Sequence, residues 1–428
     1  MEALHSSLVR ALSAALICAA AGFGPSEAAA QERAGRGRNS GRHVVAELQE
    51  RLDAGEARLE RGEQGYLRSL LRELGVPESS QMLVYSKTSL QRDHITPQTP
   101  RAIYFGDDVM VGYIPDAPMI EIAAAEGAGT AFFTIDQAGA GDRPTLERQG
   151  LTCVGCHSTS ATRGVTGLLV RSLSVDGGGR LLLDQPTYRT EHSSPLAERW
   201  GGWYVTGASG RQEHLGNRIG PPPGAARAAV DETDEETVEP AALVLNENVA
   251  ADRYPHVHSD IAALMVFEHQ VGMFNRLARA ASGGRRGQRD QADSARKRFE
   301  AAGDEVVKHL LFADEVPLVD RVEGSSTFVQ DFTARGPRDS RGRSLRDFDL
   351  TTRMFRHPCS YLIYSRTFES LPGEMKEYIY QRLWDSLAGP QADQLTPHLS
   401  AEDRQAIVEI LRETKEGLPE YWKSAASG

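Results

Sequence analysis

The pattern of hydrophobic and polar positions divides the chain into a β-rich N-terminal half and a helical C-terminal half. Between residues 81 and 135, short runs of β-branched and aromatic residues are separated by Gly, Pro and Asp, a pattern that predicts a meander of strands. These runs are MLVYS, RAIYF, VMVGYI, MIEIA and TAFFTI. Residues 164–205 predict three further strands, with the sequences VTGLLVRSL, GRLLL and GWYVT.

Apolar residues recur at helical spacing on both sides of this β-rich part. Residues 43–74 predict a helical hairpin that is interrupted at Gly62 and Gly65. After the β-rich part, the chain is expected to be mostly helical. Beyond the first long helix of that half, helices are predicted up to residue 311 and at 344–355, 374–387 and 401–415.

The most regular helix is predicted for residues 260–281. Ser259 or Asp260 is its expected N-cap, and Gly283-Gly284 is its expected terminator. A basic loop is predicted to follow and to lead into the next helix. Because strands are predicted in one half and helices in the other, the expected fold class is α+β.

The first thirty residues have the pattern of an export signal. Arg10 precedes a short apolar run at 12–23, and Ala28-Ala29-Ala30 forms an A-x-A cleavage site. Cleavage is expected after Ala30, which places the mature protein in the periplasm or outside the cell; an N-terminal helix of the fold is the alternative. The predicted segments are the signal peptide 1–30, a linker with the helical hairpin at 31–80, a β-rich region at 81–225, an acidic loop at 226–254 and a helical region at 255–428.

Composition narrows the class of protein. The 428 residues are 40% hydrophobic and 25% charged, which is typical of a globular protein. The formal net charge of −11 argues against nucleic acid as a partner. No stretch after the signal reaches the roughly 18 apolar residues of a membrane span, and four cysteines are too few for a disulfide scaffold.

The segment Cys153-Val154-Gly155-Cys156-His157 is a C-x-x-C-H motif, the attachment sequence for haem c. Two thiols on one helical turn can each add to one vinyl group of the porphyrin, and the adjacent His157 is then the proximal iron ligand. Covalent attachment takes place in the exported compartment, in agreement with the signal. The alternatives are a redox-active cysteine pair or half of a zinc site, but only Cys359 remains as a further thiol.

The sixth position of the iron decides between electron transfer and chemistry on a bound molecule. His269, Met265 and His214 are the candidate ligands, and an iron with no protein ligand there is the further possibility. Met265 and His269 share one helix face with Met273, a spacing that also fits a core stripe. Further histidines downstream of the motif are His192, His256, His258, His309, His357 and His398.

Arginines near the motif are candidate partners of the haem propionates. Arg199 lies in the Trp-rich segment RWGGWY, and Arg163 and Arg171 flank the attachment site. A strand with two core tryptophans is the alternative for the first segment. The basic run at 335–356 is either a docking surface for an acidic redox partner or a solvated helix face.

The remaining cysteine and a group of carboxylates are explained by structural roles, each with a functional alternative. Cys359 is expected to be a buried apolar thiol, with a ligand or redox role as the alternative. Asp107, Asp108 and Glu121 lie among the predicted strands, where carboxylates serve as turn formers or as ligands of a calcium ion or a substrate.

With these residues in view, the chain resembles a family of secreted bacterial mono-haem proteins with a cytochrome c domain. The resemblance covers residues 83–387. It rests on the segments SKTSLQ, YFGDDVMVGY, CVGCHSTSATRGVTGLLVRS, ERWGGWYVTG, HLGN, SDIAALMVFEHQ and SLRDFDLTTRMFRHPCSYLIYS. It implies haem binding and electron transfer, adds some weight to His214 and His269 as iron ligands, and implies no substrate.

The sequence therefore predicts an exported c-type cytochrome with one covalent haem, which exchanges single electrons with a partner protein. Its size argues for more than a simple carrier, because about 100 residues suffice to enclose one haem. The alternatives are a haem-dependent oxidoreductase of peroxidase or oxygenase type with an open iron position, and a haem-based gas sensor.

Overall fold

The computed structural model describes residues 43–127, 129–137, 144–162, 164–220, 241–242, 245–286 and 292–424. The chain divides into two compact units, 1–40 and 41–428, and all described residues belong to the second. The predicted signal peptide, the acidic stretch at 231–239 and Arg163 lie outside the described residues.

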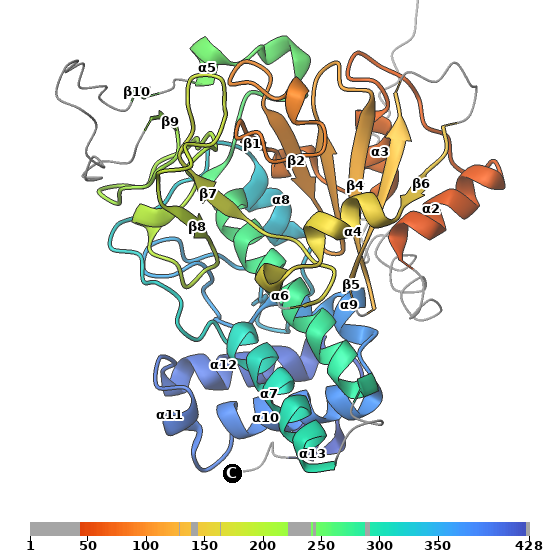
Figure 1. Cartoon of the computed structure of the whole chain (residues 1–428). Helices are drawn as coiled ribbons and strands as arrows, with labels where there is room; N and C mark the ends of the chain where they lie inside the picture. Colours follow the sequence, from red (N-terminus) through yellow and green to blue (C-terminus); the bar gives the residue numbers. More distant parts are fainter. Residues whose placement is uncertain are drawn as a thin grey trace, which may run out of the picture. The chain divides into compact units, whose positions relative to one another are not determined.

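A six-stranded antiparallel sheet occupies the N-terminal half, with its strands in sequence order (Figure 1). The strands are β1 (Met82–Val84), β2 (Arg101–Phe105), β3 (Val109–Tyr113), β4 (Met119–Glu126), β5 (Gly129–Asp136) and β6 (Glu147–Gln149). The first five coincide with the five predicted runs, so the predicted meander is confirmed. The short polar strand β6 was not predicted, because ERQ lacks the apolar alternation that marks a strand.

One face of the sheet packs against the two N-terminal helices, α2 (Val44–Asp53) and α3 (Leu67–Leu74). These helices lie on either side of the Gly62–Gly65 turn that the sequence predicts. Helix α3 contacts β3, and its buried leucines join one apolar cluster with alternate residues of the central strands. The strand residues of this cluster are Leu83, Ala102, Tyr104, Val109, Val111, Tyr113, Ile120, Ile122, Ala124, Ala131, Phe133 and Ile135.

The opposite face of the sheet packs against the long helix α6 (Ile261–Arg286), shown in green in Figure 1. Asp260 caps this helix, since its Oδ1 accepts a hydrogen bond from the Ala262 amide at 2.8 Å. The prediction that Gly283-Gly284 ends the helix is wrong, because α6 continues to Arg286. Gly283 faces Ala302 of the next helix, and small residues at this position permit the close approach of the two helices.

The C-terminal half is helical, as predicted, and the α+β class is confirmed. Helices at 374–387 and 401–415 are confirmed as α10 and α12, and no helix in the described ranges is long and apolar enough to cross a membrane. The helices after α6 are α7 (Ala292–Leu310), α8 (Phe328–Ala334), α9 (Arg366–Glu369), α10 (Gly373–Leu387), α11 (Ala392–Leu395), α12 (Ala401–Thr414) and α13 (Glu420–Ser424).

Residues 164–205 form only part of the first predicted strand, the end of VTGLLVRSL, and not the other two. They contain β7 (Arg171–Leu173) and β8 (Thr187–Arg189), which pair with each other, while GRLLL and GWYVT form only isolated bridges. Trp200 (φ +68°) and Gly202 (φ +79°) adopt left-handed backbone, which breaks an extended strand. The apolar side chains of this segment enter the core from an irregular backbone, and this is why periodicity alone misplaced them. The other short elements are β9 (Arg218–Ile219), β10 (Ala241–Ala242) and α5 (Leu245–Asn248).

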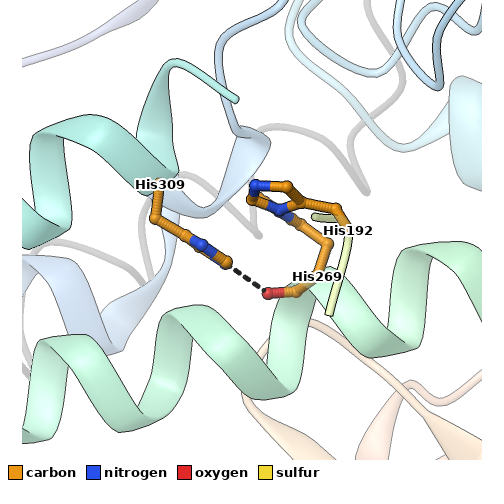
Figure 2. A group of neighbouring side chains, drawn as sticks. All are labelled: His192, His269 and His309. Carbon is orange, nitrogen blue, oxygen red and sulfur yellow. Dashed lines mark hydrogen bonds between the residues drawn. The ribbon is translucent and has the colours of Figure 1, made fainter. Parts of the chain in front are cut away.

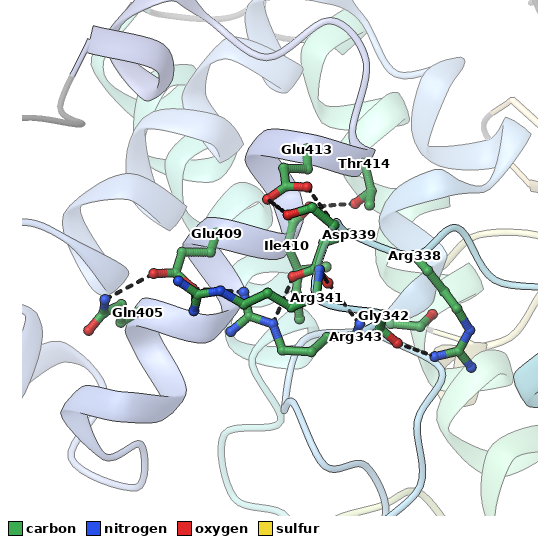
Figure 3. A network of polar contacts seen from close by, with 12 residues as sticks. Arg338, Asp339, Arg341, Gly342, Arg343, Gln405, Glu409, Ile410, Glu413 and Thr414 are labelled. Atoms are coloured by element: carbon green, nitrogen blue, oxygen red, sulfur yellow. Dashed lines mark hydrogen bonds and ion pairs between the residues drawn. The ribbon is translucent and has the colours of Figure 1, made fainter.

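The arginine-rich run at 335–356 is neither the predicted helix nor a solvated helix face. Beyond α8 it is irregular, and its arginines form ion pairs within the chain (Figure 3). Arg343 contacts both Asp339 and Glu409 at 2.7 Å. Further pairs are Arg338–Asp347, Arg341–Glu409, Arg346–Asp107 and Arg353–Asp403. The positive charge of the run is therefore largely compensated by carboxylates of the same protein.

Candidate functional site

The C-x-x-C-H motif forms the short helix α4 (Leu151–His157), which follows β6 directly. Cys153 and Cys156 lie on one helical turn, the first half-buried and the second exposed. The imidazole ring of His157 packs on Phe132 of β5, with 4.5 Å between the ring centroids. Helix α4 thus lies against the face of the sheet that also receives α6 (Figure 1).

A backbone carbonyl fixes the orientation of His157. The Nδ1 atom of His157 lies 2.9 Å from the carbonyl oxygen of Gly167, and the Gly167 amide donates to the carbonyl oxygen of His157 at 2.8 Å. Burial lowers the pKa of His157 below its usual 6.5, so the ring is neutral at pH 7. Because Nδ1 carries the proton that faces the carbonyl, the lone pair of the neutral ring is on Nε2.

The loop that carries Gly167 is clamped between β5 and α6. Asn275 of α6 accepts a hydrogen bond from the Leu168 amide at 3.1 Å and donates one to the Leu168 carbonyl at 2.7 Å. On the other side, the Thr130 amide of β5 donates to the carbonyl of Thr166 at 2.8 Å. The two neighbours of Gly167 are therefore hydrogen-bonded to β5 on one side and to α6 on the other.

An ion pair on the sheet lies next to the motif. Arg101 begins β2, and its Nη2 contacts Glu121 of β4 at 2.5 Å. The arginine reaches Glu121 across Gly112 of β3, where a Cβ would come within 2.6 Å of the guanidinium. Both charges act on the pKa of His157, the carboxylate raising it and the guanidinium lowering it. The buried Nε of Arg101 has no hydrogen-bond partner among the described residues.

The three described cysteines are all free thiols, in different surroundings. Burial and the Glu121 carboxylate raise the pKa of Cys153, which favours the thiol over the thiolate. Cys359 is fully buried, and burial raises its pKa to about 12. Its burial in an apolar cluster is confirmed, as the sequence predicts.

Each of the predicted sixth ligands has partners of its own. Met265 is buried in the core around α6. His214 packs edge-on against Trp200, and its Nδ1 accepts a hydrogen bond from the Gly216 amide at 3.1 Å. His269 lies in a buried cluster with His192 and His309 (Figure 2).

The two described arginines that the sequence suggested as propionate partners lie in different surroundings. Arg199 is fully buried and forms an ion pair with Glu268 of α6 at 3.0 Å. It donates further hydrogen bonds to the carbonyls of Ser194 and His192, so it belongs to the histidine cluster. Arg171 is exposed on β7. Arg101, which the sequence did not single out, lies beside the motif because antiparallel pairing brings the start of β2 close to β4.

The histidine cluster joins three distant segments of the chain. His269 is on α6, His309 is on α7, and His192 follows β8. The Nδ1 atoms of His192 and His269 are 2.9 Å apart, and the rings of His269 and His309 stack at 4.6 Å with an angle of 3°. Burial lowers the pKa of His192 to about 4 and those of the other two well below 6.5, so all three rings are neutral at pH 7.

In comparisons with known proteins, no family model, no curated protein and no solved structure matched this chain. Functional conclusions therefore come from the motif and from the geometry around it.

Proposed function

We propose that this protein is an exported c-type cytochrome that binds one haem covalently and transfers single electrons to or from a partner protein. Cys153 and Cys156 would form the thioether bonds, and His157 would be the proximal ligand of the iron. When bound, the haem supplies reversible one-electron oxidation and reduction. The chain contributes attachment, orientation and the electrostatic surroundings of the iron.

The observation that carries this proposal is the contact between His157 Nδ1 and the Gly167 carbonyl, 2.9 Å apart. A histidine that ligates a metal commonly donates its other ring N–H to a backbone carbonyl, which fixes the tautomer and the ring orientation. Here this bond leaves the Nε2 lone pair for the iron. A redox role for the cysteine pair does not require the neighbouring histidine to be held in this way.

Arg101 fits the edge of a haem at this site. Its Nε is buried and has no partner among the described residues, and its guanidinium lies next to His157 and Glu121. A buried donor without a partner is costly, and a propionate oxygen would satisfy it. Arg101 is therefore a better candidate for a propionate partner than Arg199, which is engaged with Glu268.

The alternative function is a haem-dependent oxidoreductase with an open iron position. The positions of His269, Met265 and His214 favour it, because each is held by other partners and would have to leave them to reach an iron. An iron without a sixth protein ligand binds small molecules, and an iron with one is suited to electron transfer.

The spectra of the purified full chain, ferric and ferrous, with and without carbon monoxide, distinguish these functions. An electron carrier is expected to be low-spin in both states and unchanged by carbon monoxide. A high-spin ferric iron, with rapid carbon monoxide binding after reduction, would favour the oxidoreductase. Absence of haem from protein produced in an export-competent, haem-attaching host would contradict both functions.

The proposal also includes a partner protein and export from the cytoplasm. The chain has a formal net charge of −11, so an electron-transfer partner with a basic surface would be attracted to it. Fractionation of cells that express the full chain tests export, because the proposal requires haem-loaded protein outside the cytoplasm, shortened at Ala30. Haem-loaded protein that keeps its first thirty residues inside the cytoplasm would contradict this part.

A further inference from the structure

We propose that His192, His269 and His309 form a second metal site, which binds one divalent first-row transition metal ion of the kind that prefers imidazole ligands. Each side chain can offer one nitrogen, and these nitrogens lie within 4.8 Å of one another. This inference does not depend on the haem, because its three ligands lie outside the C-x-x-C-H motif and its loop.

The second nitrogen of each ring is already anchored. His309 Nε2 donates to the carbonyl oxygen of His269 at 2.9 Å (Figure 2). His192 Nε2 points at the carbonyl oxygen of Ala313, a longer contact of 3.4 Å, and His269 Nε2 bonds to the Ser360 hydroxyl at 2.7 Å. A ring that donates through Nε2 keeps its lone pair on Nδ1, which is the pattern of histidines that bind metals.

The Nδ1 atoms of His192 and His269 are 2.9 Å apart. Two ligand nitrogens of a tetrahedral zinc ion at about 2.0–2.1 Å are separated by roughly 3.3 Å, so His192 and His269 need to move outward only slightly. The His309 ring, which is stacked parallel to that of His269, would have to rotate to direct its lone pair at the same ion. Without metal, one of the two Nδ1 atoms of His192 and His269 must hold a proton between them. Metal binding would move that proton to His269 Nε2, where the Ser360 hydroxyl can accept a hydrogen bond as readily as it donates one.

The surroundings hold the three rings in place. Arg199 joins the carbonyl of His192 to the carboxylate of Glu268, which adjoins His269 on α6. Phe312 stacks on the His269 ring at 4.3 Å, and its own backbone is left-handed, with φ +55°. Strain of this kind persists where surrounding contacts determine the conformation, and it is common at ligand sites.

Charge at the cluster is also compatible with a cation. The rings are neutral, and the two arginines nearest to them are paired, Arg199 with Glu268 and Arg276 with Glu191 at 2.7 Å. Three neutral imidazoles select zinc, copper, nickel, cobalt or iron(II), whereas magnesium and calcium require oxygen ligands. All three residues are almost completely buried, so the ion would be enclosed by protein and not open to bulk solvent.

The test uses the full, haem-loaded chain and three probes, Zn²⁺, Co²⁺ and Cu²⁺, so that haem iron does not interfere. After equilibration and removal of excess metal, elemental analysis is expected to give one probe ion per chain. The difference spectrum of the Co²⁺-loaded minus the Zn²⁺-loaded chain, in which the haem bands cancel, is expected to show the bands of tetrahedral Co²⁺ with nitrogen ligands. Thiolate-to-cobalt bands, or no retained metal with any of the three probes, would overturn the proposal.

Glutamine variants identify the ligands. In His192→Gln and His309→Gln, the amide N–H replaces Nε2–H and keeps the bond to a backbone carbonyl, while the Nδ1 lone pair is lost. Because loss of an outer hydrogen bond alone weakens metal binding about 10–100-fold, each variant is expected to lose about 100-fold or more in affinity. His398→Gln is the matched control, since His398 Nε2 also bonds to a carbonyl, that of Leu311, outside the cluster.

The control is expected to bind metal like the wild type. Wild-type affinity in both cluster variants would contradict the proposal. If either variant fails to fold, the cobalt spectrum of the wild type still decides between nitrogen ligands and none.

Discussion

His157 and Gly167 are joined by two reciprocal contacts, ring nitrogen to carbonyl at 2.9 Å and amide to carbonyl at 2.8 Å. Gly167 itself is packed so tightly that a Cβ would meet the Asn275 side-chain oxygen at 2.0 Å. A single glycine thus determines where the His157 ring points, and Asn275 of α6 determines where the glycine lies.

The variant Gly167→Ala tests this relationship. The added methyl group must displace Asn275 or the loop, and such overpacking costs about 1–3 kcal/mol. We expect a lower free energy of unfolding and a smaller fraction of chains with attached haem. The control is Gly155→Ala, on α4 itself, where a Cβ meets nothing within 4 Å and helix propensity improves by roughly 0.5–1 kcal/mol. Equal haem content in the two variants would contradict the role of Gly167.

Arg101→Gln tests the proposed role of Arg101 as the partner of a haem propionate. Ferric iron carries one more positive charge than ferrous iron. Removal of a nearby positive charge therefore stabilises the ferric state relative to the ferrous state, and the midpoint potential is expected to fall. Arg171→Gln removes an exposed charge on β7 and serves as the control, with little change expected. Redox titration of both proteins measures the difference. A larger shift of the midpoint potential in the Arg171 variant would contradict this assignment and would favour Arg171, which the sequence suggested, as the propionate partner.

The buried pair of Arg199 and Glu268 is expected to matter for stability more than for haem attachment. Its side chains are 2% and 0% exposed, so Glu268→Ala leaves an unpaired buried guanidinium. Breaking a buried ion pair costs about 3–5 kcal/mol. Urea unfolding measures the loss, and the paired replacement Arg199→Met with Glu268→Leu is expected to recover much of it. A loss below about 1 kcal/mol, the range of surface pairs, would contradict this view.

Glu315 gives the fold a pH dependence of known sign. Burial raises its pKa from 4.5 to about 7, so the folded state holds a proton that the unfolded state has released between these values. Stability from this group is therefore present below pH 4.5 and is lost as the pH rises through 7, with a full cost on the order of 3 kcal/mol.

The variant Glu315→Gln removes this titration and keeps an oxygen for the Met354 amide, which donates to Glu315 at 2.9 Å. We expect the substitution to stabilise the protein at pH 8 and to have little effect at pH 4.5, as measured by urea unfolding at both values. Asp320→Asn, at an exposed carboxylate whose pKa is lowered, is the control and is expected to show no such gain at pH 8. An equal effect of Glu315→Gln at both pH values would mean that the carboxyl group titrates alike in the folded and unfolded states.

The sequence predicted the strands of the sheet from short runs of β-branched and aromatic residues bounded by turn residues. Both faces of the sheet are covered, so β3 and nearly all of β2 and β5 are buried, and only β4 alternates between buried and half-buried positions. The Trp-rich segment at 200–206 is equally apolar but irregular, because left-handed residues at Trp200 and Gly202 turn it repeatedly. Burial without regular backbone leaves no periodic signal, and this is why the predicted strands there were wrong.

The candidate site was predictable only where its residues are adjacent in the sequence. The C-x-x-C-H motif is local, whereas His192 lies 77 residues and His309 lies 40 residues from His269. No spacing rule joins positions so far apart. The packing of α6 against α7 brings His269 and His309 together, and the segment that follows β8 adds His192. The sequence did not identify Arg101 as part of the site for the same reason, because only the pairing of the strands places it beside His157.

The most direct test of the central claim is the intact mass of the full chain, purified after production in an export-competent host, compared with that of Cys153→Ala/Cys156→Ala. We expect the wild-type mass to exceed that of the polypeptide by one haem, and this haem to resist acid–acetone extraction. The double variant is expected to carry no haem. Cys359→Ala, which removes a thiol outside the motif, should keep the full haem mass. A wild-type chain without covalent haem, or a double variant that retains it, would contradict the account.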